Sequence, residues 1–65
     1  MIKILIGNNI YCFTAIWKAD DEIALYGSIG SEQICIEKYY SYESLKKDFE
    51  KIVKAIEKNE PLIKL

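Results

Sequence analysis

The chain contains neither histidine nor arginine, so all nine of its cations are lysines. Histidine is the commonest general base and a common zinc ligand, and its absence argues against acid–base catalysis and against a zinc site. Arginine has a planar guanidinium group that binds carboxylates and phosphates through two parallel hydrogen bonds, and this mode of binding is missing here. Lysine, tyrosine, cysteine and carboxylates remain, but the missing residue types favour a protein without enzymatic activity, cofactor or bound metal.

Other scarce features exclude further classes of protein. One proline and three glycines in a chain that is 51% hydrophobic are not the composition of a disordered or low-complexity segment. No apolar run approaches the roughly 20 residues of a membrane span, and the apolar start at Met1–Ile6 is too short for a secretory signal. We therefore expect a cytoplasmic location and no membrane partner. The net charge of −1 argues against nucleic acid as a partner.

The length of 65 residues allows one domain, which we place over residues 1–65. A core of this size supplies about 3–5 kcal/mol of net stability, so such chains often depend on a partner or on a disulfide or other covalent cross-link. The two cysteines are too few for a disulfide scaffold. Cys12 and Cys35 belong to no Cys-x-x-Cys motif, and we expect both to be free thiols on opposite faces of a sheet.

Four segments have the β-branched and aromatic composition of short strands. We predict these strands over residues 2–6, 10–18, 22–27 and 32–39. Turn residues separate them, at Gly7-Asn8-Asn9, at Asp20-Asp21 and at Gly27–Ser31. The short spacing between strands predicts an antiparallel meander of three to four strands.

The last third of the chain changes to a helical period. Apolar residues recur at helical spacing at Leu45, Phe49, Ile52, Val53 and Ile56. They predict an amphipathic helix over residues 42–58, with Ser41 as its N-cap and Asn59 as a left-handed C-cap. Pro61 then begins a short apolar tail, residues 61–65. The predicted fold is α+β, a small antiparallel meander with one C-terminal helix packed on one face.

Alternation along the strands divides the predicted sheet into two faces. Short turns at Asp20-Asp21 and Ile29-Gly30 set Ile16 opposite Leu25 and Leu25 opposite Ile34, although a slip of one residue would exchange the faces. The face under the helix is then aliphatic, with Ile10, Cys12, Ile16, Ile23, Leu25, Ile34 and Ile36. The other face carries Tyr11, Phe13, Ala15, Trp17, Ala24, Tyr26, Gln33, Cys35 and Glu37. One helix cannot cover both faces, so four aromatic side chains are expected on an uncovered surface.

Such a face favours a binding function, because soluble monomers rarely leave a large apolar patch open and aromatic residues dominate interface hot spots. The predicted binding residues are Tyr11, Phe13, Trp17, Tyr26, Gln33 and Cys35. The favoured hypothesis is a non-enzymatic, homo-oligomeric interaction or inhibitor module, whose partner is a second copy or a host protein. The alternative is a protein that sequesters a planar, nucleotide-like molecule, as a phage-encoded anti-defence protein would. In a third interpretation, Leu62 and Leu65 fold over the aromatic residues and complete the core.

Three other motifs have simpler interpretations. Asp20-Asp21-Glu22 lacks the alternating oxygen ligands of a calcium loop and is typical of a solvated turn. The glycines between residues 27 and 31 do not lead into a helix, as a phosphate-binding loop does. Lysines recur on the outer helix face, but acidic residues on the same helix nearly balance them, which indicates a solvated surface. These lysines are Lys46, Lys47, Lys51, Lys54 and Lys58.

Overall fold

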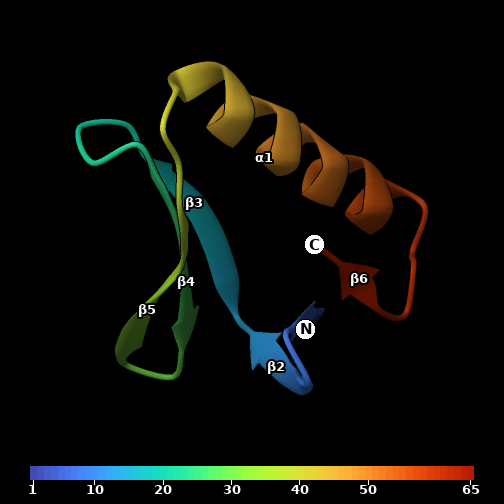
Figure 1. Cartoon of the computed structure of the whole chain (residues 1–65). Helices are drawn as coiled ribbons and strands as arrows, with labels where there is room; N and C mark the ends of the chain where they lie inside the picture. The colour runs from blue at the N-terminus through green and yellow to red at the C-terminus, as the bar shows by residue number, and fades with distance from the viewer.

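The computed structural model covers the chain from Met1 to Leu65 and confirms the α+β class (Figure 1). Its strands are β1 (Ile2–Ile6), β2 (Asn9–Phe13), β3 (Ala15–Ala19), β4 (Ala24–Ile29), β5 (Glu32–Lys38) and β6 (Ile63–Lys64). One helix, α1 (Tyr42–Glu57), lies between β5 and β6 in the chain. This helix lacks the length and the apolar run that crossing a bilayer requires.

The strands form two three-stranded sheets instead of the single sheet that was predicted. In one sheet, β1 lies between β2, with which it pairs antiparallel, and β6, with which it pairs parallel. The other sheet is the antiparallel meander β3-β4-β5. The prediction of one strand over residues 10–18 is therefore wrong, because this segment is interrupted at Thr14 and its halves pair in different sheets.

Thr14 is held to the end of β4 where the chain passes from one sheet to the other. Its backbone N–H donates to the carbonyl oxygen of Ser28 at 2.8 Å. Its side-chain Oγ1 donates to the same oxygen at 3.1 Å and lies 3.0 Å from the Ser28 hydroxyl. These bonds satisfy the polar groups of a residue that interrupts the strand. They also fix the point at which β2 ends and β3 begins.

The core lies between the two sheets and beneath α1, and it draws side chains from both sheets and from the helix. Its buried members are Ile4, Phe13, Leu25, Ile36, Leu45, Ile52, Ala55 and Ile63. Phe13 is the largest side chain that is completely buried. The tail supplies Ile63 to this core through β6, whose pairing with β1 gives the short segment a fixed place.

The ends of α1 are capped as the sequence predicts. The Ser41 hydroxyl accepts a hydrogen bond from the Ser44 N–H at 3.3 Å. At the other end Asn59 has a φ of 56°, and the Glu60 N–H donates to the Ala55 carbonyl at 3.0 Å. This is the geometry of a left-handed helix cap.

The predicted core-facing stripe of α1 is only partly correct. Leu45 and Ile52 are buried and Phe49 is half-buried against the core. Val53 and Ile56 instead remain 38% and 42% exposed. Ala55, which the predicted stripe omits, is buried and takes part in the core from the C-terminal half of the helix.

The predicted strand register is wrong by two residues over most of the sheet. Beyond a bulge between Leu25 and Tyr26 it is wrong by three, so Leu25 lies opposite Glu37, and Ala24, expected on the uncovered face, is completely buried. Ile16 lies opposite Gly27 because the connection from β3 to β4 contains four residues and not two. Gly27 lies opposite Ile34 because the next turn is at Gly30-Ser31 and not at Ile29-Gly30. Ile23, predicted within a strand, ends the connection from β3 to β4 with a φ of 52°. A shift of two residues preserves the faces of a strand, so Ile16 and Ile34 still pack against the core. Ile10, by contrast, is 58% exposed and does not belong to the expected aliphatic face.

Gly27 lies within β4, whereas the sequence places it where a strand ends and a turn begins, and the ring of Phe13 packs directly on it. A Cβ atom built on Gly27 would lie 2.5 Å from Cδ1 and 2.8 Å from Cε1 of Phe13. The turn itself lies at Gly30 and Ser31, where Gly30 adopts a φ of 61°. Gly27 is therefore a packing position, at which any side chain would displace the largest residue of the core.

We predict that Gly27→Ala lowers the free energy of unfolding by about 1–3 kcal/mol, the usual cost of overpacking a core. In a Phe13→Leu background the same substitution should cost less, because the ring that meets the new methyl group is gone. Urea melts of the two single variants and the double variant measure this coupling. Equal costs of Gly27→Ala in both backgrounds would contradict the contact.

Candidate functional site

The side of the β3-β4-β5 sheet that faces away from the core carries a row of three residues, one from each strand. Trp17 lies directly opposite Tyr26, and Tyr26 lies directly opposite Cys35. The Trp17 and Tyr26 rings are nearly parallel, with centroids 6.2 Å apart and an angle of 17° between their planes. This separation is within the range of favourable aromatic pairs.

The next row on the same side consists of small or polar side chains, at Ala15, Ser28 and Gln33. We call the six residues of the two rows the outer face. Trp17 and Tyr26 are half-buried within it, whereas Ala15, Gln33 and Cys35 are exposed. None of the six carries a formal charge. The outer face therefore presents two large flat rings beside short, neutral side chains.

The hydroxyl of Tyr26 is influenced by the loop between β3 and β4. The Glu22 carboxylate, as a hydrogen-bond acceptor, raises the pKa of Tyr26, and partial desolvation acts in the same direction. Both effects favour the neutral phenol over the phenolate. Tyr26 thus keeps a neutral hydroxyl within reach of Glu22.

The structure places two of the predicted binding residues elsewhere, and the prediction of a four-aromatic uncovered face is wrong. Phe13 is completely buried in the core. Tyr11 is half-buried against the same core and stacks on Phe13, with centroids 6.0 Å apart. The interruption at Thr14 is the physical reason, since it turns β2 into the other sheet and directs its aromatic side chains inward. Trp17, Tyr26, Gln33 and Cys35 remain together.

On the inner side of β3, Lys18 contacts α1, a contact that the sequence did not reveal. Its ammonium donates to the Tyr42 hydroxyl at 3.2 Å and lies 5.4 Å and 5.2 Å from the ring centroids of Tyr42 and Phe49. The hydrogen bond to Tyr42 is the main cause that raises the pKa of Lys18. Such a cation above two rings adds a cation–π attraction to the hydrogen bond.

A second polar contact joins α1 to the end of β5. The Tyr39 hydroxyl donates to Oδ2 of Asp48 at 2.7 Å. Burial raises the pKa of Tyr39 well above its ordinary value, and the nearby Asp48 carboxylate raises it further. Together with Lys18, this contact fixes α1 on the core side of the β3-β4-β5 sheet, so the helix leaves the outer face open.

Both cysteines are free thiols. Cys12 is half-buried on β2, whereas Cys35 is exposed on β5 in the other sheet. No group of three or more cysteine, aspartate or glutamate side chains is arranged to hold a metal ion. What the outer face offers chemically is stacking, burial of apolar surface and hydrogen bonding through Tyr26 and Gln33.

Comparisons of the chain with protein-family models, with curated proteins and with solved structures give no match. The functional argument therefore rests on the geometry of this chain alone.

We predict that Trp17 contributes less to folding than Phe13 does, although it is the larger residue. Phe13→Ala empties the centre of the core and should cost about 3–5 kcal/mol. Trp17→Ala removes a half-exposed ring and its stacking on Tyr26, and should cost about 1–2 kcal/mol. Denaturant melts of the two variants make the comparison. A larger loss for Trp17→Ala would show that the outer face is part of the core.

Proposed function

We propose that the chain is a non-enzymatic binding module that works through the Trp17–Tyr26 pair of the outer face. The observation that supports this proposal is the stacked pair on a sheet side that the rest of the chain does not cover. In Figure 1, α1 and the strands β2 and β6 lie to one side of the β3-β4-β5 sheet. Tryptophan and tyrosine are the residues most often found at binding hot spots, because they bury large areas at low entropic cost.

A second copy of the chain is the partner that we favour. Two identical outer faces can pack about a two-fold axis, and each then removes the other from water. The six residues of the face carry no formal charge, so their own burial requires no ion pair. The small core is a further reason, since chains of this length often gain stability from association. An inhibitor role would use the same face against a host protein.

The two nearly parallel rings of the outer face support a second candidate, the sequestration of a planar, nucleotide-like molecule. Stacking of a base on an aromatic side chain contributes about 1–3 kcal/mol and does not depend on base identity. Ala15 and Cys35 are short and would not obstruct a ring lying on Trp17 or Tyr26. In either case we expect the module to act in a reducing cytoplasm, where its thiols stay free.

We predict that the protein forms a dimer or higher oligomer, and that Trp17→Ala and Tyr26→Ala each weaken it about 30-fold, the effect of a hot spot of about 2 kcal/mol. Tyr40→Ala is the matched control, because Tyr40 is a fully exposed aromatic residue outside the outer face. Sedimentation equilibrium over about 1–100 μM covers the range of a weak specific dimer. The oligomer of Tyr40→Ala should match that of the wild type.

The rate of Cys35 alkylation provides a second measurement on the same samples. It should fall as the protein concentration rises, whereas the rate at the half-buried Cys12 should not change. A monomer throughout this range would exclude self-association. If added nucleotide then slows the alkylation of Cys35, the sequestration hypothesis gains support. If neither concentration nor nucleotide protects Cys35, the outer face is not a binding surface of either kind.

A further inference from the structure

Each sheet has two edge strands, and three of the four edges are protected against pairing with another strand. The edges are β2 and β6 in one sheet and β3 and β5 in the other. Native proteins protect such edges with charges, bulges, very short strands or a covering helix. β5 contains a bulge and three charged residues. β3 carries Lys18, whose contacts with Tyr42 and Phe49 hold α1 beside this strand.

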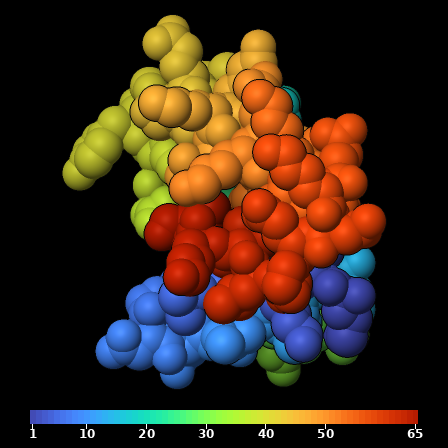
Figure 2. Space-filling view, turned by 90° about the vertical axis from the view of Figure 1, so that its right-hand side faces the viewer, coloured from blue at the N-terminus to red at the C-terminus, as the bar shows by residue number.

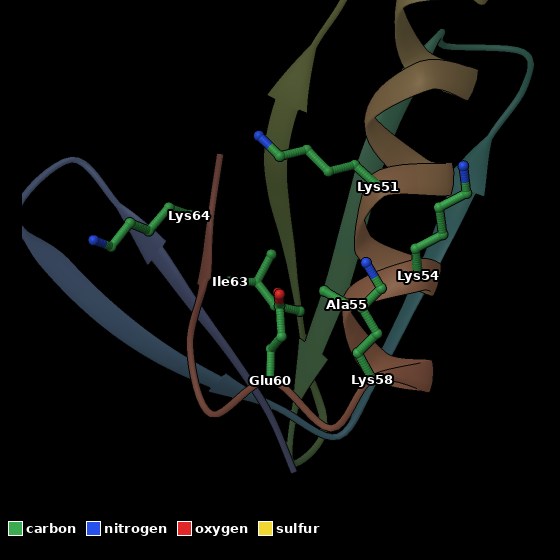
Figure 3. A pocket seen from close by; sticks show the side chains of 7 residues that line it. All are labelled: Lys51, Lys54, Ala55, Lys58, Glu60, Ile63 and Lys64. Carbon is green, nitrogen blue, oxygen red and sulfur yellow. The ribbon is translucent and has the colours of Figure 1, made fainter.

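The third protected edge is β6, which lies between α1 and the β1–β2 hairpin (Figure 2). It comprises only Ile63 and Lys64. These two residues line a groove together with Lys51, Lys54 and Lys58 of the helix and its C-cap (Figure 3). A strand this short, with lysines beside it, offers little to a further strand.

β2 has none of these protections. Its five residues, Asn9–Phe13, include no charge and no proline, and they pair with β1 without a bulge. Figure 2 shows the hairpin of β1 and β2, in blue, at the lower border of the molecule. Ile10 is 58% exposed there. A regular, uncharged edge strand is the kind to which another strand adds.

The backbone groups of Ile10 and Cys12 point to the open side of β2. The two-residue turn before β2 makes the pair beside it hydrogen-bonded, and such pairs alternate with non-hydrogen-bonded ones. Ile10 and Cys12 fall in the non-hydrogen-bonded pairs, so their N–H and C=O groups point away from β1. Thr14, two residues later, agrees with this direction, because its N–H donates to Ser28 of the other sheet. Outside the strand ladders, no hydrogen bond involves the backbone of Ile10 or Cys12.

We infer that β2 is a strand-addition edge, at which the β2 strand of a second copy pairs antiparallel. The outward N–H and C=O groups of Ile10 and Cys12 then exchange hydrogen bonds with the β2 backbone of that copy. The bond between Thr14 and Ser28 closes the edge beyond Phe13, so the pairing is confined to the five residues of β2. The result is one continuous sheet that contains β6, β1 and β2 of both copies.

A second copy is the occupant that the four edges favour. Two identical uncharged strands bring no like charges opposite each other, and β-branched and aromatic side chains pair well across strands. Each copy has one open edge, so the pairing of two copies uses both edges and the protected edges prevent further growth. The β2 edge is separate from the outer face, and the inference does not rest on the proposed function.

The test is amide hydrogen exchange, measured by NMR over about 0.1–2 mM protein. A pairing of five residues is smaller than a standard interface, and we expect a Kd of about 1 mM. The amides of Ile10 and Cys12 should therefore exchange about twofold more slowly at the upper concentration than at the lower. The amides of Tyr11 and Phe13, which face β1, should stay protected throughout. This range lies above the one in which the outer face is tested.

Three variants at one position separate backbone pairing from side-chain contact. Ile10→Pro removes the outward N–H without breaking a bond to β1, so the exchange of the Cys12 amide should no longer depend on concentration. Ile10→Ala is the matched control, because it truncates the same side chain but keeps the N–H, and it should retain the dependence. Ile10→Lys adds a charge to the open edge and should act as Ile10→Pro does.

Four outcomes would overturn the inference. The first is exchange at Ile10 and Cys12 that does not depend on concentration in the wild type. The second is equal behaviour of Ile10→Pro and Ile10→Ala, which would exclude backbone pairing. The third is a dependence that persists in Ile10→Lys, which keeps the test decisive if Ile10→Pro fails to fold. The fourth is loss of the dependence in Trp17→Ala, which would assign the protection to the outer face. Protected amides at Tyr11 and Phe13 show that each variant is folded.

Discussion

The packing of Phe13 on Gly27 is the contact on which the arrangement of the two sheets depends. Gly27 has no side chain, so the ring from β2 can lie directly on the backbone of β4. One residue later, Thr14 is hydrogen-bonded to Ser28 and turns the chain into the other sheet. A single continuous segment can therefore contribute its aromatic residues to the core through β2 and form an edge strand of the meander through β3.

The packing of the two sheets and the helix around one core determines which surfaces remain for binding. The helix and the first sheet share one core with the inner side of the meander, which leaves the outer face of the meander uncovered. The pairing of β6 with β1 holds Ile63 in the same core. The surface that this arrangement leaves for binding is thus a neutral face that carries the Trp17–Tyr26 pair.

Local signals predicted much of this fold, whereas long-range contacts could not be predicted. Composition and caps identified the strands and the helix. The register error left Trp17, Tyr26 and Cys35 on one face, as predicted, but their alignment in a single row was not predicted. The interruption at Thr14 was missed because threonine is a good strand residue and gives no local sign of a break. Gly27 was assigned to a turn because packing against a distant ring leaves no local signal. The place of the C-terminal tail depends on the parallel pairing of β6 with β1, which only the tertiary structure reveals.

Trp17 is the only tryptophan of the chain, so its fluorescence reports on the outer face alone. The most direct test of this account is the emission maximum of Trp17 and its quenching by acrylamide over a dilution series. As the protein concentration rises, the account predicts that the emission maximum moves to shorter wavelength. It also predicts that acrylamide quenches Trp17 less, because the ring becomes shielded from solvent. Emission and quenching that stay the same at every concentration, in a protein that remains folded, would contradict self-association through the outer face.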